Sequence, residues 1–402
     1  MSIRTQDFRT KTVYQPTRNI SVDGKWPIGL DIGYSGVKGF SPNAIFAFPS
    51  FAKNLGKNPT FYGEPDEDEI LYRDDETKEI WRVGRNAEKM ISERDTSNSQ
   101  LELYGRDRYY TQMYTVIARA GIALGCLNNE CGDYIADNEI VIQTGLPPAY
   151  KEADTGAITD VFADNHKFSI KTGRTRGYVS FNLNIERKNV RVMSQPEGTL
   201  MSIALDNNAK SLKGANRYFT SNIIFFDAGF GTFDLFDITS GTVHSKESFS
   251  DFGMRAVLDE CCKKIYEEKG VVVRPQVMQN ILERGEITIQ KRGRGTFASH
   301  TEPIADALEA ASNEVCKRAV NKVIDTYAGL IDYKYLVLTG GTAAAWLDEL
   351  KETFSQVQHL TIIPGNINCP DLDMIFCNVR GYYLYVVSAL DREAKVHKQV
   401  HH

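Results

Sequence analysis

Cysteine is scarce in this sequence, and the cysteines present do not form a disulfide framework. Seven is a small and odd number for 402 residues, and neither Cys126/Cys131 nor Cys261/Cys262 has a nearby histidine or a CxxC partner. Such usage fits a reducing compartment, so we predict a cytoplasmic protein without structural zinc. We expect burial of these side chains as small apolar groups; the full set is Cys126, Cys131, Cys261, Cys262, Cys316, Cys369 and Cys377.

Long hydrophobic runs are also missing. The longest, such as 223–226, fall far short of the roughly 18 to 20 residues that cross a bilayer. The mean hydropathy is -0.34. The segment 1–19 lacks the continuous apolar stretch of a secretory signal. We therefore expect neither a membrane segment nor export.

An excess of positive charge is absent as well. The chain has 47 Lys and Arg against 52 Asp and Glu, a formal net charge of -5. It is a poor counterion for nucleic acid, and direct DNA binding would need a local patch. The basic loop with Lys291, Arg292 and Arg294 is more typical of a solvated tip. Hydrophobic residues make up 42%, enough for a sizeable core, and the length suggests two or three domains.

The two commonest nucleotide-binding patterns do not occur: there is no GxxxxGK[ST] loop and no GxGxxG after a strand. Instead, LDIGYSGVK at 30–38 resembles FDAGFGTFD at 226–234. Each copy ends an apolar strand in Asp, places Gly two residues later and returns as a second strand. A duplicated β-hairpin is the simplest account of this repeat.

The duplicated hairpin suits a polyphosphate bound together with a metal ion. Glycine at the turn has no Cβ, so backbone N–H groups can approach anionic oxygens closely. A carboxylate at each strand end can hold the waters of a bridging Mg²⁺. We predict this role for Asp31 and Asp227, with Lys38 as a point charge for phosphate. Either hairpin alone is more typical of an ordinary turn, and it is the repeat that favours phosphate binding.

A third element, YLVLTGGTAAAW at 335–346, is a buried strand that ends in Gly340-Gly341 where a helix begins. Such a junction leaves no side chain between the backbone and a ligand, so a flat nucleoside could lie there. Close packing of strand and helix explains the same glycines equally well when the segment is taken alone.

The alternation of strands and helices predicts an α/β fold. Residues 1–27 show little periodicity, and we expect a mobile or surface-lying extension. Residues 64–79 hold nine acids, which favours a solvated hairpin loop. Helices are expected at 108–125, from 196 to about 205, at roughly 253–287 and 303–330, from 342, and from about 379 to 395.

At these motifs the chain resembles the actin/Hsp70/sugar-kinase ATPase superfamily. The two hairpins resemble its two phosphate motifs, and 338–342 resembles its adenosine motif. Within the superfamily the chain is most similar to the ParM-type bacterial actins that segregate plasmids. This choice rests on TGLP at 144–147, VMSQPEG at 192–198, the step from Trp81 to Ala87, and NVRGYY at 378–383.

The resemblance implies an actin-like fold: two ribonuclease H-like α/β domains, related by duplication, with a nucleotide cleft between them. ATP, with GTP as the alternative, and Mg²⁺ would lie in the cleft. The expected division is an extension at 1–27, domain I at 28–205 and 369–402 with a small subdomain at about 45–95, and domain II at 206–368 with a small subdomain at about 255–300.

The same resemblance implies roles for individual residues. Asp31 and Asp227 would hold Mg²⁺ through water, Asp227 also lying near the attacking water, and Gln195 or, second, Glu197 would orient that water. Tyr34 stands where relatives often have Ser or Thr, and Ser35 is the substitute hydroxyl. The remaining nucleotide-binding residues would be Gly33, Tyr34, Ser35, Lys38, Gly229, Phe230, Gly231, Thr232, Gly340, Gly341 and Thr342.

Proteins that share this fold have three kinds of function that could apply to the chain. The leading one is an ATPase that polymerises into nucleotide-dependent filaments and engages plasmid DNA through a DNA-binding adaptor at the centromere, without direct contact to nucleic acid or membrane. A small-molecule kinase of the same fold is the alternative, but beyond Glu197 no carboxylate stands out as its base. An Hsp70-type chaperone is disfavoured, because only about 60 residues follow the adenosine motif, too few for a peptide-binding domain.

Overall fold

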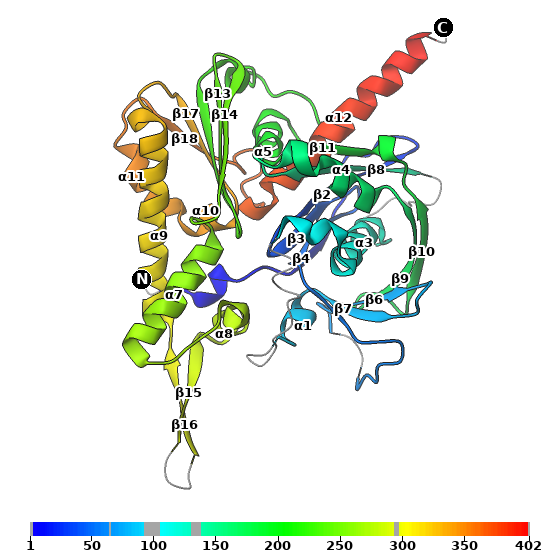
Figure 1. Cartoon of the computed structure of the whole chain (residues 1–402). Helices are drawn as coiled ribbons and strands as arrows, with labels where there is room; N and C mark the ends of the chain where they lie inside the picture. Colours follow the sequence, from blue (N-terminus) through cyan, green and yellow to red (C-terminus); the bar gives the residue numbers. More distant parts are fainter. Residues whose placement is uncertain (1–2, 64–65, 92–104, 130–137, 293–296, 401–402) are drawn as a thin grey trace.

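Two central sheets with the same strand order form the framework of the molecule (Figure 1). The computed structural model describes residues 3–63, 66–91, 105–129, 138–292 and 297–400. The first sheet has the order β1-β4-β3-β2-β8-β11 and the second β14-β13-β12-β17-β18. Their strands are β1 (Val13–Pro16), β2 (Lys25–Ile32), β3 (Gly36–Phe40), β4 (Ala44–Pro49), β8 (Glu139–Leu146), β11 (Val190–Ser194), β12 (Ile223–Ala228), β13 (Phe233–Thr239), β14 (Thr242–Phe249), β17 (Tyr335–Thr339) and β18 (Thr361–Pro364).

Apart from β1, the two sheets correspond strand for strand. In each, a buried strand (β2 or β12) pairs antiparallel with the strand that follows it and parallel with a later one (β8 or β17). Such strands read as continuous apolar runs because both of their faces are covered. The predicted duplicated α/β fold with two domains is therefore confirmed. We call the part built on β1–β11 domain I and the part built on β12–β18 domain II.

Two helices that cross each other fill the space between the sheets. α5 (Gln195–Ala204) packs on the second sheet through Leu200 and Ile203, and α12 (Cys377–Val400) packs on the first through Val379 and Tyr383. Further helices beside the two central sheets are α3 (Gln112–Cys126), α4 (Lys151–Phe162), α6 (Arg217–Thr220), α9 (Ala305–Thr326), α10 (Gly341–Ala345) and α11 (Leu347–Ser355), with the short turns η2 (Arg106–Tyr110), η3 (Arg187–Asn189), η5 (Ala328–Leu330) and η6 (Met374–Phe376).

Each domain carries a smaller part beside its central sheet. In domain I this part is the sheet β10-β9-β6-β7-β5 with helix α1, and in domain II it is two helices and a hairpin that projects away from the body (Figure 1). The elements are β5 (Ala52–Asn54), β6 (Ile70–Asp74), β7 (Ile80–Val83), α1 (Arg85–Glu88), β9 (Asn165–Thr172) and β10 (Val179–Asn184) in domain I, and α7 (Met254–Lys269), η4 (Pro275–Val277), α8 (Met278–Arg284), β15 (Glu286–Arg292) and β16 (Phe297–Pro303) in domain II.

Two local predictions need correction here. The acidic stretch 64–79 is not a loop throughout, because 70–74 forms β6, whose Ile70, Leu71 and Tyr72 are buried. The segment between the helical stretches expected at 253–287 and 303–330, read as a basic loop, contains the two strands of the β15–β16 hairpin. The strand β6 was missed because its three apolar residues are flanked by acidic residues on both sides. Arg294 of the basic loop lies outside the described residues.

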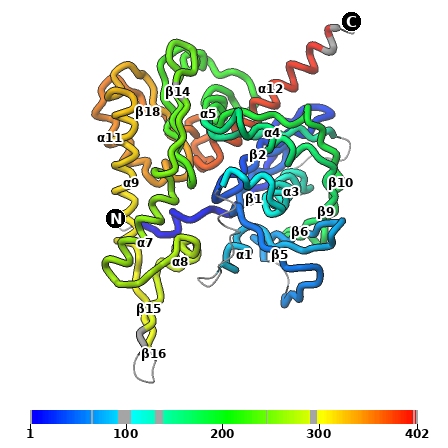
Figure 2. Tube along the Cα trace, in the orientation of Figure 1, coloured from blue at the N-terminus to red at the C-terminus, as the bar shows by residue number. Residues whose placement is uncertain are grey.

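The segment 3–24, part of the extension expected to be mobile or surface-lying, lies mostly at the surface but is packed on both domains. Its first part, η1 (Thr5–Phe8), packs against α8 and α10 of domain II. The chain then crosses to domain I, where β1 pairs with β4, and β2 already begins at Lys25. Figure 2 shows this crossing as the blue end of the tube, which leaves domain I for α7 and α8. Aperiodic sequence therefore does not mean unpacked chain.

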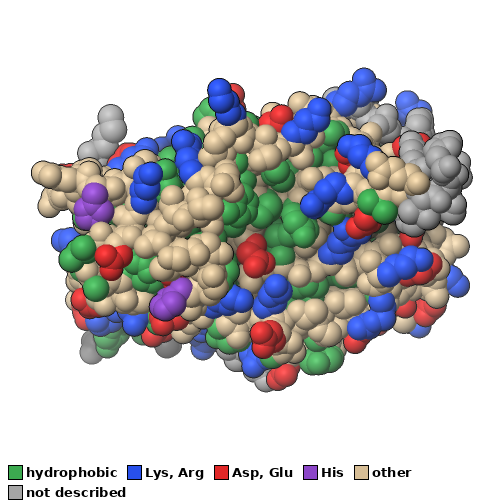
Figure 3. All heavy atoms as spheres, turned by 90° about the horizontal axis from the view of Figure 1, so that it is seen from above, with side chains coloured by type: hydrophobic (Ala, Val, Ile, Leu, Met, Phe, Trp, Pro, Cys, Tyr) green, Lys and Arg blue, Asp and Glu red, His purple; other side chains and the backbone are tan. Residues whose placement is uncertain are grey.

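The cysteines, the hydrophobicity of the helices and the surface charge were also predicted from the composition. Five of the cysteines are buried as predicted, Cys369 is partly exposed, and Cys131 lies outside the described residues. Among the described helices none is long and apolar enough to cross a membrane. On the face that Figure 3 shows, Lys and Arg side chains lie among Asp and Glu side chains, in keeping with the small net charge.

Candidate nucleotide site

A cavity of about 440 Å³ lies where the two domains meet. All of the predicted site residues except Thr232 and Glu197 line it, although they come from segments far apart in the chain. Its predicted lining comprises Asp31, Gly33, Tyr34, Ser35, Lys38, Gln195, Asp227, Gly229, Phe230, Gly231, Gly340, Gly341 and Thr342.

The two hairpin turns have the same geometry. In the first, the Gly33 N–H donates to the Gly36 carbonyl at 3.1 Å; in the second, the Gly229 N–H donates to the Thr232 carbonyl at 2.9 Å. The tips meet across the cavity, since a Cβ on Gly231 would lie 2.4 Å from Cδ2 of Tyr34. Only glycine fits at 231, and the two turns form opposite walls of one cavity.

Asp31 ends the first of the two equivalent strands and is 6% exposed. Its Oδ1 accepts a hydrogen bond from Gln195 Nε2 at 3.0 Å, and Lys38 Nζ lies 3.4 Å from its Oδ2. A cation and an amide therefore hold this carboxylate in place. Lys38 Nζ also lies only 2.9 Å from the point where a Gly33 Cβ would stand, so the ammonium group sits at the turn.

Asp227 ends the equivalent strand of the second sheet and is 4% exposed. Its Oδ2 accepts a hydrogen bond from Asn378 Nδ2, at the start of α12, at 2.9 Å. Burial raises the pKa of Asp227 to about 6; the Asn378 hydrogen bond opposes this shift, and the charge of Asp31 adds to it. A bound cation would favour the ionised form of this carboxylate.

Asp234, which the sequence analysis did not include among the site residues, is a third buried carboxylate on the cavity wall. It is 2% exposed, and Thr232 Oγ1 donates to its Oδ2 at 3.0 Å, while its Oδ1 has no hydrogen-bond partner. Burial, followed by the charge of Asp227, raises the pKa of Asp234 to about 8. The available signal was its place at the end of the second repeat, seven residues after Asp227.

The Gly340-Gly341 junction, where β17 meets α10, forms a further part of the cavity wall. Gly340 has φ +94, and a Cβ there would lie 2.3 Å from the Ala228 carbonyl oxygen, so both conformation and space require glycine. Thr342 Oγ1 donates to the Gly229 carbonyl at 2.6 Å and thereby ties α10 to the second hairpin. The third motif thus packs directly on the second.

Tyr34 lies in the turn of the first hairpin and lines the cavity. The guanidinium of Arg108 lies 4.2 Å from the centre of its ring, and Arg108 is itself buried, 4% exposed. Ser35 lines the cavity beside it. This stacking fixes the aromatic side chain at the domain interface.

The two candidates for orienting water are in different places. Gln195 lines the cavity at the first turn of α5 and reaches Asp31. Glu197 instead accepts a hydrogen bond from the backbone N–H of Ser194 at 2.8 Å, and it lies in a separate pocket with Lys151. Glu197 thus belongs to the capping box of α5, in which Ser194 is the N-cap and the Glu197 carboxylate accepts a hydrogen bond from its backbone N–H.

The donor set fits a magnesium ion bound mainly through phosphate and water. Two buried carboxylates, Asp31 and Asp227, lie in a cavity lined by the two glycine turns, and the unpartnered Oδ1 of Asp234 adds acceptor capacity. Among the described residues, no group of three or more His, Cys, Asp or Glu could hold a metal ion. Mg²⁺ commonly uses one or two carboxylates together with substrate phosphates, which is what this wall offers.

Comparison with known proteins agrees with this architecture. The family model for the N-terminal domain of actin-like proteins matches residues 29–198, which contain the first hairpin and Gln195. A 15-stranded ParM filament from Clostridium botulinum has 19% identity and a TM-score of 0.64, covering 90% of this chain and 99% of that one. The fold is that of the actin-like proteins.

Two further structures lie in the same group. The apo psk41 ParM protein has 18% identity and a TM-score of 0.61, with 93% of this chain and all of that chain covered. The archaeal actin homologue Ta0583 in complex with ADP has 17% identity and a TM-score of 0.57, with 89% and 97% covered. No curated protein matches the sequence. The resemblance to actin-like, ParM-like proteins that the sequence motifs indicated is confirmed.

Proposed function

We propose that this actin-like chain binds ATP, with GTP as the alternative, together with Mg²⁺ in the cavity between its domains and hydrolyses the nucleotide. The observation that carries the proposal is the meeting of two equivalent acidic hairpins at one cavity, each aspartate held by an amide from a helix start. The structure of an archaeal actin homologue with ADP supports a nucleotide as the ligand of this fold.

The residues divide the work as follows. Backbone N–H groups of the two glycine turns bind phosphate oxygens, and Lys38 adds a positive charge beside them. The side-chain amide of Gln195 forms a hydrogen bond with the attacking water, and Asp31 holds that amide in place by accepting a hydrogen bond from its Nε2. Bound Mg²⁺ would supply charge neutralisation between phosphate oxygens, with Asp31 and Asp227 as its protein anchors.

We further propose that nucleotide binding controls assembly of the chain into filaments. A ligand that contacts both domains favours the closed arrangement, and a head-to-tail contact that does not close into a ring gives a helical polymer. The likeness to a ParM filament supports this assembly. By the same resemblance, plasmid segregation through a DNA-binding adaptor is the proposed cellular role.

The test is sedimentation of the purified protein with ATP, with ADP and without nucleotide, combined with phosphate release. We expect a pellet with ATP and slow hydrolysis, because only positioning and metal electrostatics act on the water. Phosphate transfer to an added sugar without any pellet would favour the kinase alternative. Absence of a pellet under all nucleotide and salt conditions would eliminate the filament.

A further inference from the structure

Residues 3–12 form a strap that joins the two domains across the cavity. Three hydrogen bonds dock the strap on α8 of domain II: Thr5 Oγ1 donates to the Leu282 carbonyl at 2.8 Å, Gln6 Nε2 to the Glu283 carbonyl at 3.3 Å, and the Thr10 N–H to Gln279 Oε1 at 3.0 Å. Directly after the strap, Val13 pairs with Ala47 in the sheet of domain I. The strap therefore has one end in each domain.

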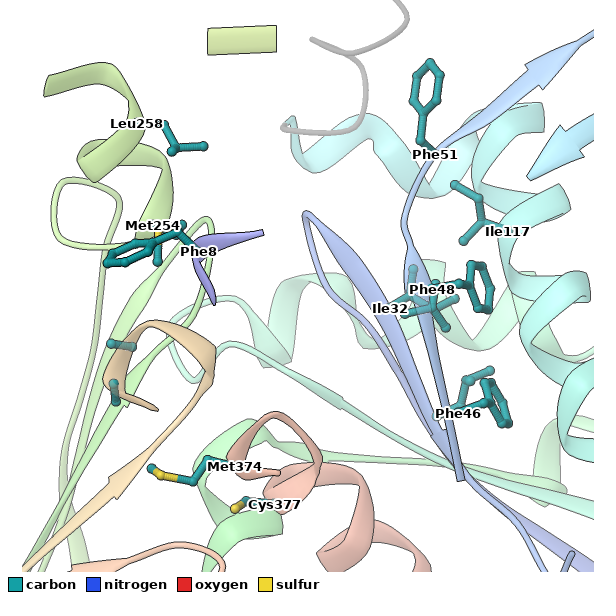
Figure 4. Close-up of a cluster of buried hydrophobic side chains, with 14 of the residues drawn as sticks. Phe8, Ile32, Phe46, Phe48, Phe51, Ile117, Met254, Leu258, Met374 and Cys377 are labelled. Atoms are coloured by element: carbon teal, nitrogen blue, oxygen red, sulfur yellow. The ribbon is translucent and has the colours of Figure 1, made fainter. Parts of the chain in front are cut away.

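Phe8 anchors the strap in the hydrophobic core of domain II. Its side chain is 7% exposed and belongs to the same cluster as Met254 and Leu258 of α7. Figure 4 shows Phe8 next to Met254, on the side of the view opposite Ile32 and Phe48 of domain I. Because burial of a large aromatic side chain is strongly favourable, this contact is the main apolar anchor of the strap.

A charged cluster, the latch, holds the strap where the small parts of both domains approach each other. Arg9 Nη2 lies 3.3 Å from Glu283 Oε2 in α8 and 3.7 Å from Glu88 Oε2 in α1. Arg85 of α1 reaches Glu283 Oε1 at 2.5 Å and thereby links the two domains directly. Burial raises the pKa of Glu88 to about 7, and the charge of Arg9 opposes this shift.

Within the latch, the pair of Arg9 and Glu88 is the buried part. The side chains of Arg9 and Glu88 are each 10% exposed. Removal of one partner of a buried ion pair leaves the other charge without compensation, which costs far more than loss of a surface pair. Arg9 is the member that pairs with a carboxylate of each domain, so its removal should weaken the latch most.

The strap is also a wall of the candidate nucleotide cavity. Ile3, Arg4 and residues 7–11 line it together with the glycine turns and the three aspartates. Thr10 lies close to the first hairpin: its Cγ2 is 3.0 Å from the position that a Cβ on Gly36 would take. The next residue, Lys11, forms an ion pair with Asp373, which also lines the cavity. A ligand in the cavity would be covered by the strap.

We propose that residues 3–12 are a retaining strap for the nucleotide: they hold the domains together over the cavity, and a nucleotide enters or leaves only when the strap releases α8. This inference rests on the proposed nucleotide site. The matched family model begins at residue 29, so the strap lies outside the segment that the model covers.

The test measures release of a pre-bound fluorescent ATP analogue after addition of excess unlabelled ATP. We expect Phe8→Ala and Arg9→Ala each to release it at least ~10-fold faster than the unaltered chain, equivalent to about 1.4 kcal/mol of lost closure. Glu283→Gln, which weakens the latch from the α8 side, should act in the same direction. The effects of Glu283→Gln and Arg9→Ala should add up to less than their sum, because both substitutions remove the pair between Arg9 and Glu283.

Arg18→Ala, an exposed residue beyond the strap, is the matched control and should release at the original rate. Thermal melting of each nucleotide-free variant verifies folding, and Glu283→Gln keeps the test valid if a strap variant fails to fold. Release within about twofold of the original rate in the folded variants would overturn the strap while leaving the nucleotide site intact. A chain that binds no nucleotide analogue at all would instead overturn the proposed function and the strap together.

Discussion

Lys38 and Asp234 occupy the same position in the two halves of the molecule. Lys38 pairs across β2 and β3 with Asp31, and Asp234 pairs across β12 and β13 with Asp227, in identical register. The first aspartate therefore faces a cation, whereas the second faces another acid. This difference within an otherwise duplicated hairpin makes the second half the acidic wall of the cavity.

The acidic pair is the source of a pH effect. The pKa of Asp227 is raised to about 6 and that of Asp234 to about 8, so the folded chain holds protons that the unfolded chain has lost above pH 4. Stability from this source is complete below about pH 4 and is lost as pH rises through about 6 and then about 8. Without nucleotide and Mg²⁺, the free energy of unfolding should fall over this range.

Asp234→Asn should remove the upper part of this fall. Between about pH 6 and pH 8.5 the free energy of unfolding, measured with urea, should fall for both chains. The fall should be smaller for the variant than for the original chain, by on the order of 1–3 kcal/mol. Asp251→Asn, at an exposed aspartate, is the control and should leave the pH profile unchanged. Parallel profiles for the original chain and Asp234→Asn would show that Asp234 is ionised throughout.

Asp227→Asn should separate catalysis from folding. The amide keeps the shape of the carboxylate, and its oxygen can still accept the hydrogen bond from Asn378. With the anchor for the cation gone, we expect phosphate release to fall by ~100-fold or more. The melting temperature without nucleotide should stay the same or rise, since a buried charge has been removed. Unchanged turnover would place the metal-binding carboxylate elsewhere.

The site could be found from the sequence where its signal is local. Asp31 and Asp227 each end an apolar strand and are followed two residues later by glycine, so strand, turn and carboxylate all lie within nine letters. The same holds for Gly340-Gly341 at a strand-to-helix junction. Because the motif repeats, the sequence also predicted that the halves match.

Contacts between residues far apart in the chain could not be predicted from the sequence. Asn378 lies 151 positions from the Asp227 that it orients, and nothing around it indicates an amide directed at a carboxylate. The strap has no hydrophobic periodicity because Phe8 is its single large buried apolar side chain. Its packing depends on where α7 and α8 stand in the folded chain, and that depends on the whole of domain II.

Gln195→Ala and Glu197→Ala should have opposite signatures. Loss of the Gln195 amide should slow hydrolysis by ~10-fold or more with little change in nucleotide affinity, since the group acts on the water. Loss of Glu197 removes a helix cap and should cost about 1 kcal/mol of stability with hydrolysis nearly unchanged. Single-turnover phosphate release and urea unfolding of both variants check this. Slower hydrolysis in Glu197→Ala alone would exchange the two roles.

The crossing of α5 and α12 is closest at two glycines. A Cβ on Gly381 would stand 1.7 Å from the Gly198 carbonyl oxygen, so Gly381→Ala must push the helices apart. We expect a loss of about 1–3 kcal/mol or more in urea unfolding. Gly156→Ala is the control: that position lies in α4 with open space around it, and alanine there should stabilise by about 0.5–1 kcal/mol.

The same substitution should affect the chemistry beyond its effect on stability. Gln195 begins α5 and Asn378 lies in the first turn of α12, so the two amides that hold Asp31 and Asp227 are mounted on the helices that Gly198 and Gly381 bring together. Separating the helices draws both amides away from their carboxylates. Gly381→Ala should therefore slow phosphate release even at a temperature where it is fully folded, because misplacement of positioned groups by about 1 Å can cost ~100-fold. If the folded variant hydrolyses nucleotide at the original rate, the helix crossing does not position the site.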